Sequence, residues 1–327
     1  MAALDRIPLI DFGAFVDGDP AGKRRAAAAI RDACEQIGFL YLTNHGVPRE
    51  KIDAVFAAAH RFFALPPERK QDPAIRVTPQ RTRGYQPLFA RHYANTDAPD
   101  VNEAFKYQHE YPPDDPDIVA GNRFHQTNQW PAALPGWRET LLDYFDEMER
   151  LSDRLLRAFA LALDLEEEWF LAFYRKPLTQ VTLLHYPPQP AQAPERQYGI
   201  RPHADSTAFT VLAQDAVGGL QVESRKGGWI DAPPIDGAFV INIGDMMARW
   251  TNDRFKSTPH RVINLTGRER YSVPFFAIPD FDAVVECLPS CQGPDNPPKY
   301  PPLHVGNAIT RKFATDWRRE GEAAKTA

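Results

Sequence analysis

The sequence of 327 residues has few cysteines, only Cys34, Cys287 and Cys291. Three cysteines are too few for a disulfide framework, and a spacing of four between Cys287 and Cys291 is not that of a zinc ribbon or a redox motif. The odd number is typical of a reducing compartment, so we expect a cytoplasmic protein. No run of about 18 apolar residues occurs, which argues against a membrane-spanning helix. Residues 1–11 contain acidic side chains and lack the apolar stretch of a signal peptide.

The sequence also lacks a strong excess of either charge. It has 38 Lys and Arg against 43 Asp and Glu, which gives a net charge of −5, and it contains no long basic run. A nucleic-acid-binding protein or one that binds anionic membranes would need a basic surface. We therefore expect neither partner. The sequence does not determine the oligomeric state, and a monomer is the favoured expectation.

Proline is abundant, with 31 residues or about 9% of the chain, against a usual value of about 5%. Because proline breaks helix interiors, an all-helical bundle is disfavoured. The apolar periodicity predicts helices over 26–37, 49–63 and 141–163, and a strand over 39–42. The stretch from about 70 to 136 is polar and irregular. After Pro177, short runs rich in β-branched and aromatic residues indicate a β-sandwich or barrel: 180–186, 209–214, 219–223, 239–243, 261–265 and 272–278.

One short motif in this second half carries metal-binding chemistry. His203 and Asp205 are two residues apart, so on a strand both side chains would point to the same face. His260 follows 55 residues later at the start of another apolar run. Two histidines and one carboxylate form a face that leaves three of six octahedral positions open, which suits Fe(II) that must also bind a cosubstrate and O2.

A second pair lies ten residues beyond His260. Arg270 and Ser272 again share one face of a strand. Arginine is suited to hold a carboxylate with two hydrogen bonds, and a serine hydroxyl adds a third. The two sets together predict a site for a small keto acid, whose 1-carboxylate and ketone bind the metal and whose far carboxylate reaches Arg270.

The chain resembles the isopenicillin N synthase-like family of Fe(II)/2-oxoglutarate-dependent dioxygenases from about Ile7 to about Trp317. Besides the residues above, ordered matches occur along both halves of the chain: IPLIDF at 7–12, GFLYLTNHGV at 38–47, FFALP at 62–66, NQWP at 128–131, HADSTAFTVL at 203–212, GGLQV at 218–222, INIGD at 241–245, WTN at 250–252, HRV at 260–262 and RYS at 270–272.

This resemblance implies an α+β fold, mainly β with surrounding helices, whose core is a double-stranded β-helix (a distorted, cupin-like jelly roll). The chain 1–327 would form one structural unit. It would have a mainly helical region at 1–175 with an irregular substrate-covering segment at about 78–130, the jelly-roll core at 176–285, and a C-terminal extension at 286–327.

The resemblance also implies a function and a set of site residues. His203, Asp205 and His260 would bind Fe(II), and Arg270, Ser272 and Tyr186 would bind 2-oxoglutarate. With O2 as the other cosubstrate, the enzyme would hydroxylate, desaturate or cyclise a small organic substrate and release succinate and CO2. Leu184 stands where many plant members have asparagine, so one cosubstrate contact is expected to be missing. Candidates for substrate contact are Phe276, Phe105 and Lys106.

Three other interpretations are open at this point. Isopenicillin N synthase and the plant ethylene-forming oxidase keep the Arg-x-Ser pair without using 2-oxoglutarate, so the chain could be an Fe(II) oxidase of that type. A jelly-roll scaffold that has lost its iron is disfavoured by the intact His203, Asp205 and His260. A nucleic-acid dioxygenase is disfavoured by the net charge of −5.

Overall fold

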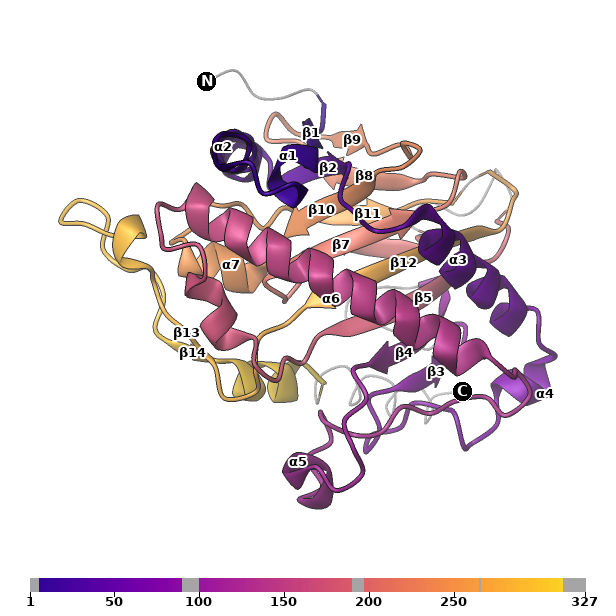
Figure 1. The fold of residues 1–327 in the computed structure, drawn as a ribbon. Coiled ribbons are helices and arrows are strands. Elements are labelled where there is room, and N and C mark those ends of the chain that lie inside the picture. Colours follow the sequence, from indigo (N-terminus) through magenta and orange to yellow (C-terminus); the bar gives the residue numbers. More distant parts are fainter. Residues whose placement is uncertain (1–5, 90–99, 190–196, 265, 314–327) are drawn as a thin grey trace.

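Two β-sheets form the centre of the molecule in a computed structural model, which describes residues 6–89, 100–189, 197–264 and 266–313 (Figure 1). The larger sheet has the order β1 (Leu9–Asp11), β2 (Phe39–Thr43), β10 (Phe239–Ile243), β7 (Phe209–Gln214), β12 (Arg270–Ala277), β5 (Gln180–Tyr186), β4 (Glu103–Gln108) and β3 (Gly84–Gln86). The smaller sheet has the order β6 (Ile200–His203), β11 (His260–Val262), β8 (Leu220–Glu223) and β9 (Trp229–Asp231). Only the β1–β2 pair is parallel among these described strands.

From β5 to β12 the chain passes repeatedly between the two sheets. β5, β7, β10 and β12 belong to the larger sheet, and β6, β8, β9 and β11 belong to the smaller one. This alternation is the double-stranded β-helix, so the predicted fold class is confirmed. The predicted strands at 180–186, 209–214 and 239–243 have the observed bounds. The predicted strand at 261–265 is observed as β11, and residue 265 lies outside the described residues.

Helices cover the outer face of the larger sheet. They are α2 (Pro20–Gln36), α3 (Arg49–Phe63) and α6 (Trp137–Ala162), and α6 crosses in front of the strands in Figure 1. The apolar stripe of α6 is buried in the core that this helix layer shares with the sheet. The shorter α-helices are α1 (Gly13–Val16), α4 (Pro67–Lys70), α5 (Pro116–Val119) and α7 (Asp245–Trp250), and two 3-10 helices are η1 (Trp169–Phe173) and η2 (Pro289–Cys291). Two further strands, β13 (Val284–Val285) and β14 (Leu303–His304), form a separate pair, and residues 305–313 after β14 are helical.

The transition from α2 to β2 depends on Gly38. Its φ of +70° lies in the left-handed region, and a Cβ there would come within 1.9 Å of the Lys256 carbonyl oxygen. Only glycine meets both conditions without strain. Gly38 therefore ends α2 and sends the chain directly into the strand that lies beside β10.

The prediction of an irregular stretch from 70 to 136 is wrong in part, because β3 and β4 lie within it and extend the larger sheet beyond β5. Both faces of β4 are buried, and its inner face carries Ala104 and Lys106 instead of large apolar residues. The usual alternation of polar and apolar residues is therefore absent, and pairing with β5 determines the strand. Residues 90–99 of the predicted segment lie outside the described residues.

A buried charged cluster ties these added strands to β5. The carboxylate of Glu103 on β4 accepts hydrogen bonds from Lys70 Nζ at 2.9 Å and from the Tyr85 hydroxyl at 2.5 Å, and it lies 2.8 Å from His185 Nδ1 on β5. Burial raises the pKa of Glu103, but the hydrogen bonds from His185, Tyr85 and Lys70 together bring this pKa below the usual value. Glu103 is thus ionised at neutral pH.

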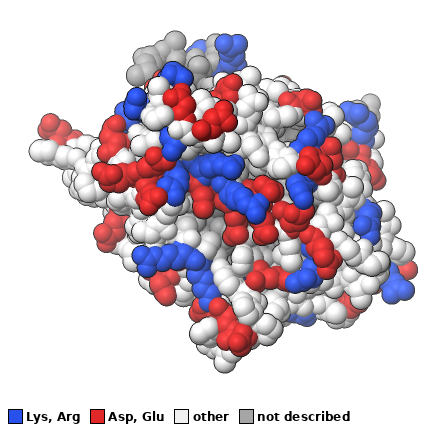
Figure 2. Space-filling model, viewed as in Figure 1, with Lys and Arg blue, Asp and Glu red and all other residues white. Residues whose placement is uncertain are grey.

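Both signs of charge occur on the face that α6 crosses, where Lys and Arg alternate with Asp and Glu (Figure 2). Within the described ranges, no helix is both long and apolar enough to cross a membrane.

Replacing Glu103 by leucine is expected to lower the free energy of unfolding by about 3–5 kcal/mol, because it leaves the buried ammonium of Lys70 without its counter-ion. Denaturant unfolding measures this difference. Asp53→Leu is the control, because Asp53 forms an exposed ion pair with Arg49, whose loss is worth about 1 kcal/mol or less.

The effect of Glu103 on stability also has an expected pH dependence. Because its pKa is lowered by folding, the advantage of the wild-type chain over Glu103→Leu is complete above the ordinary glutamate pKa and is lost as the pH falls through the lowered value. A difference in unfolding free energy that stayed constant into this acid range would contradict the assignment.

Candidate metal centre and cosubstrate pocket

The smaller sheet brings the two predicted histidine ligands together. His203 ends β6 and His260 begins β11, and these antiparallel strands place the two residues opposite each other. The ring centroids are 4.4 Å apart. Asp205 lies in the loop that follows β6, with Oδ1 at 3.6 Å from His203 Nε2 and 3.9 Å from His260 Nε2. The three side chains thus offer one donor atom each within 4.8 Å of one another.

Asp205 reaches this position by a different route from the one predicted. β6 ends at His203, so Asp205 does not share a strand face with it. The loop is fixed by a backbone hydrogen bond from Asp245 N to the Asp205 carbonyl oxygen at 2.7 Å. Thr210 on β7 and Asn242 on β10 donate to Asp205 Oδ2 at 2.6 and 2.8 Å. The larger sheet therefore orients the carboxylate and leaves Oδ1 directed at the two imidazoles.

The charge state of Asp205 suits a cation. Burial raises the pKa of this carboxyl group, but His260, His203 and the hydrogen bonds from Thr210 and Asn242 together hold it below the ordinary value. The carboxylate is consequently ionised at neutral pH, as a metal ligand must be.

Backbone carbonyls set the tautomer of both histidines. His203 Nδ1 lies 2.8 Å from the Arg201 carbonyl oxygen, and His260 Nδ1 lies 3.3 Å from that of Thr258. A carbonyl oxygen only accepts, so each Nδ1 carries the proton and each Nε2 carries its lone pair. Both Nε2 atoms lie near Asp205 Oδ1, at 3.6 and 3.9 Å. The residues fit Fe(II) with open coordination positions.

The same cavity contains Arg270 on β12, whose side chain is 0% exposed. Its guanidinium donates to the Gly218 carbonyl oxygen at 2.5 Å, to Gln214 Oε1 at 3.2 Å and to Ser272 Oγ at 3.3 Å. No carboxylate of the described chain forms an ion pair with it. A buried cation without a counter-ion is costly, so this end of the cavity fits an anionic group of a ligand.

Tyr186 and Leu184 complete this end from β5. Strand pairing sets Tyr186 opposite Arg270 and Leu184 opposite Ser272. The guanidinium of Arg270 lies 4.6 Å from the centre of the Tyr186 ring. Both residues of β5 line the cavity. Leu184 is apolar, so its side chain offers no hydrogen bond there.

The three predicted substrate residues lie in different places. Phe276 lines the cavity. Lys106 lies on the same face of the larger sheet as Leu184, because both alternate with residues of the helix-side core. Phe105 is 0% exposed and packs against Phe62 and Trp137 in that core. The structure therefore corrects the prediction for Phe105, which points away from the cavity.

Sequence reasoning missed Thr210, Asn242 and Gln214. Asn242 could have been recognised from the sequence, because it is a polar residue in an otherwise apolar strand, Phe239–Ile243. Thr210 and Gln214 could not, because threonine is common in strands and Gln214 is the last residue of its strand.

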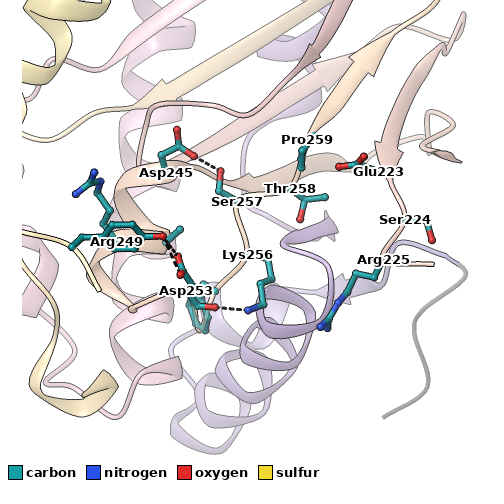
Figure 3. A pocket seen from close by; sticks show the side chains of 13 residues that line it. Glu223, Ser224, Arg225, Asp245, Arg249, Asp253, Lys256, Ser257, Thr258 and Pro259 are labelled. Carbon is teal, nitrogen blue, oxygen red and sulfur yellow. Dashed lines mark hydrogen bonds between the residues drawn. The ribbon is translucent and has the colours of Figure 1, made fainter. Parts of the chain in front are cut away.

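A wider surface cleft lies beside this centre and is not part of it. Figure 3 shows its lining, which includes Asp245, Ser257, Asp253 and Lys256. Ser257 Oγ donates to Asp245 Oδ1 at 2.7 Å, and Asp253 pairs with Lys299 at 3.1 Å. Two of its acidic groups thus already have partners in the chain, whereas the cavity has candidate ligand groups that lie close together.

Two family profiles match the chain. The profile described as "non-haem dioxygenase in morphine synthesis N-terminal" matches residues 7–133. The profile of the 2OG-Fe(II) oxygenase superfamily matches residues 172–279, a range that contains every metal and cosubstrate candidate.

Curated relatives and solved structures agree with these profiles. The 2-oxoglutarate-Fe(II) type oxidoreductase hxnY of Emericella nidulans is 38% identical over 317 residues, covering 95% of this chain and 90% of the relative. A full-length Neurospora crassa protein crystallised in complex with alpha-KG has a TM-score of 0.85 at 31% identity, covering 96% of this chain and 99% of its own. JOX2 in complex with 2OG, Fe and JA has a TM-score of 0.77 at 30% identity, covering 93% and 83%. This chain belongs to the Fe(II)- and 2-oxoglutarate-dependent oxygenase superfamily, in the isopenicillin N synthase-like group, and is an oxidoreductase that uses iron, 2-oxoglutarate and O2.

Proposed function

We propose that His203, Asp205 and His260 hold the Fe(II) of this oxygenase, and that Arg270, Ser272 and Tyr186 bind its 2-oxoglutarate. The observation that carries the proposal is a single cavity with two ends of matching chemistry. One end has three donor atoms within 4.8 Å of one another, and the other has a buried guanidinium with no counter-ion in the described residues. A dicarboxylate that also binds a metal satisfies both ends.

The protein groups have separate tasks in the proposed reaction. Arg270 and Ser272 hold the far carboxylate of 2-oxoglutarate, and the Tyr186 hydroxyl donates a further hydrogen bond to it. Thr210 and Asn242 keep Asp205 in position. Apolar residues of both sheets, such as Leu212 and Val262, line the cavity between the ends and keep water out. The bound iron supplies the oxidative step, in which O2 and 2-oxoglutarate give succinate, CO2 and one oxidised substrate molecule.

The substrate in this proposal is a small organic molecule, oxidised by hydroxylation, desaturation or ring closure. Solved relatives were crystallised with such molecules, the Neurospora crassa protein with thymine and JOX2 with JA. We propose a reducing compartment such as the cytoplasm, since Cys34, Cys287 and Cys291 are all free thiols. The monomeric state stays a prediction.

Stoichiometry tests the use of 2-oxoglutarate directly. With a working substrate, one succinate is expected for each O2 consumed, because decarboxylation is coupled to oxidation. Oxygen consumption without succinate would instead indicate the isopenicillin N synthase type of oxidase, for which Arg270 would have a different anionic ligand.

The metal-binding assignment predicts a role for the groups that hold Asp205. Asn242→Leu removes one hydrogen bond to Oδ2 and is expected to weaken metal binding about 10–100-fold, whereas His203→Ala is expected to abolish it. Anaerobic titration with Fe(II) measures both effects. Thr179→Val is the control, because Thr179 is buried and its hydroxyl bonds only the Ile278 carbonyl oxygen. Unchanged affinity in His203→Ala would refute the ligand set.

The cosubstrate assignment predicts the effect of Arg270→Gln. Loss of charge-assisted hydrogen bonds costs about 1.5–3 kcal/mol, so the KM for 2-oxoglutarate is expected to rise by roughly 10–100-fold. Succinate formation at varied 2-oxoglutarate measures it. Arg261→Gln is the matched control, because Arg261 stacks on Trp229 at 4.0 Å and bonds Gln221 on a neighbouring strand. An equal KM in Arg270→Gln and wild type would place the keto acid elsewhere.

A further inference from the structure

The loop that leads into His260 is docked on the end of α2. Lys256 N donates to the Cys34 carbonyl oxygen at 2.9 Å, and the Thr258 hydroxyl donates to the Ile37 carbonyl oxygen at 2.6 Å. Both acceptors lie at the C-terminal end of α2, where carbonyl groups have no partner within the helix. The loop supplies the missing donors, so it is fixed to the helix by hydrogen bonds.

Thr258 reaches the metal centre through its backbone. Its carbonyl oxygen accepts the Nδ1 proton of His260 at 3.3 Å and so directs the opposite nitrogen of that ring to the metal position. Pro259 between the two has a fixed φ and disfavours helical backbone at Thr258. The Pro259 carbonyl oxygen also accepts from Glu223 N at 2.9 Å. The short segment is therefore stiff, and the anchor of the Thr258 side chain bears directly on the imidazole.

The turn that follows α2 also contacts the His260 ring itself. Phe39, two residues after the carbonyl that binds Thr258, is 1% exposed and lines the cavity. Its ring meets the His260 imidazole edge to face, with the centroids 5.4 Å apart. This turn thus holds His260 in two ways, by a hydrogen bond through Thr258 and by the packing of Phe39.

The other candidate histidine ligand has a matching arrangement. His203 Nδ1 lies 2.8 Å from the Arg201 carbonyl oxygen, and Arg201 Nε donates to Asp100 Oδ1 at 3.0 Å. In both cases the carbonyl that takes the Nδ1 proton belongs to the residue two positions earlier, whose side chain is bonded elsewhere. Asp100 and Ile37 both lie in the range 7–133. The N-terminal part of the chain therefore reaches each imidazole through one intermediate residue.

We infer that Thr258 is a positioning residue of the metal centre and that it acts through its hydroxyl. The bond to Ile37 fixes the Thr258 carbonyl, and this carbonyl holds the His260 ring with Nε2 directed at the metal. Thr258 lines the surface cleft of Figure 3 and is not among the residues that line the cavity, so it acts through His260. The inference rests on the proposed function, because this orientation has a task only if His260 binds the metal.

The test compares two substitutions that differ in the hydroxyl. Thr258→Val keeps the branched shape and removes the donor, whereas Thr258→Ser keeps the donor. Anaerobic calorimetric titration of the full chain with Fe(II) measures both. Thr258→Val is expected to weaken Fe(II) binding about tenfold or more, as the loss of a group that orients a metal ligand does, whereas Thr258→Ser is expected to stay within about threefold of wild type.

A second measurement follows the His260 ring directly. In the Zn(II)-loaded chain with 15N-labelled histidine, the Nδ1 proton of His260 is expected to be visible by NMR in wild type and in Thr258→Ser. In Thr258→Val its exchange with water is expected to be about tenfold faster or more, because its hydrogen bond opens more often. The Nδ1 proton of His203 is the internal reference and is expected to be unchanged, which a general loss of stability would not allow.

Thr43→Val is the matched control. Thr43 is also partly buried, lies at the other end of β2 from Phe39, and donates its hydroxyl to the Ile10 carbonyl oxygen at 3.3 Å. Its loss is expected to leave the Fe(II) affinity unchanged. Denaturant unfolding of the metal-free chains verifies that each variant is folded, and Thr258→Ala replaces Thr258→Val if that variant is not.

Several results would overturn the inference. Wild-type Fe(II) affinity in Thr258→Val would do so, and so would an equal loss in Thr258→Val and Thr258→Ser, because it indicates packing and not the hydroxyl. In Zn(II)-loaded wild type, a His260 ring without a proton on Nδ1 would do so without the use of a variant. Failure of wild type to bind Fe(II) would instead contradict the proposed function, so the two failures are distinguishable.

Discussion

The residues of every central strand in the larger sheet must pack on two buried faces at once. One face packs against the helix layer, and the other faces the smaller sheet and the cavity. β5 shows the constraint most clearly, since Val181 and Leu183 belong to the helix-side core while Leu184 and Tyr186 line the cavity. Because side chains alternate along a strand, a slip of one residue would exchange the two sets. The register of the sheet therefore determines the core and the chemistry together.

Ionic groups appear on both faces of these strands, and they differ in how they are compensated. On the helix side, Glu103 has Lys70, Tyr85 and His185 as partners, so its charge stabilises the folded chain. On the cavity side, Arg270 has neutral acceptors and no carboxylate partner in the part of the chain that the structure describes. This part of the fold thus leaves the Arg270 charge uncompensated at the proposed cosubstrate site, and the compensated cluster on the other face of β5 holds the strand that carries Tyr186. A stabilised scaffold permits such a destabilising site.

The sequence was a good guide where one physical signal dominated. The helix at 49–63 has the predicted bounds because its apolar period is regular and prolines precede and follow it. The three candidate metal ligands were predicted from residue type and spacing, and the structure brings them together. The reason given for Asp205 was wrong, because a loop fixed from β7 and β10 holds it, and no local pattern encodes contacts from distant strands.

Other features could not be predicted for a related reason. Phe105 and Lys106 are neighbours on β4, so they necessarily point to opposite faces. The alternation of side chains along a strand shows that the two point in opposite directions, but it does not show which of them faces the cavity. That choice depends on the pairing of β4 with β5, which is a contact between residues about 80 positions apart. Both residues were candidates for substrate contact, whereas the structure places Phe105 in the core between the sheet and the helices.

The distribution of the site along the chain suggests how specificity and chemistry are separated. All candidate metal and cosubstrate residues lie in the segment 172–279, on β5 and in later parts of the chain. The substrate candidate Lys106 lies in the segment 7–133, on β4, which pairs with the edge strand β3. In the larger sheet β3 is the edge strand and pairs with β4 alone among the described strands, whereas β4 pairs with both β3 and β5, and β12 pairs with both β5 and β7. Substitutions on β3 therefore disturb fewer strand pairs than substitutions on β5 or β12, which carry the cosubstrate candidates.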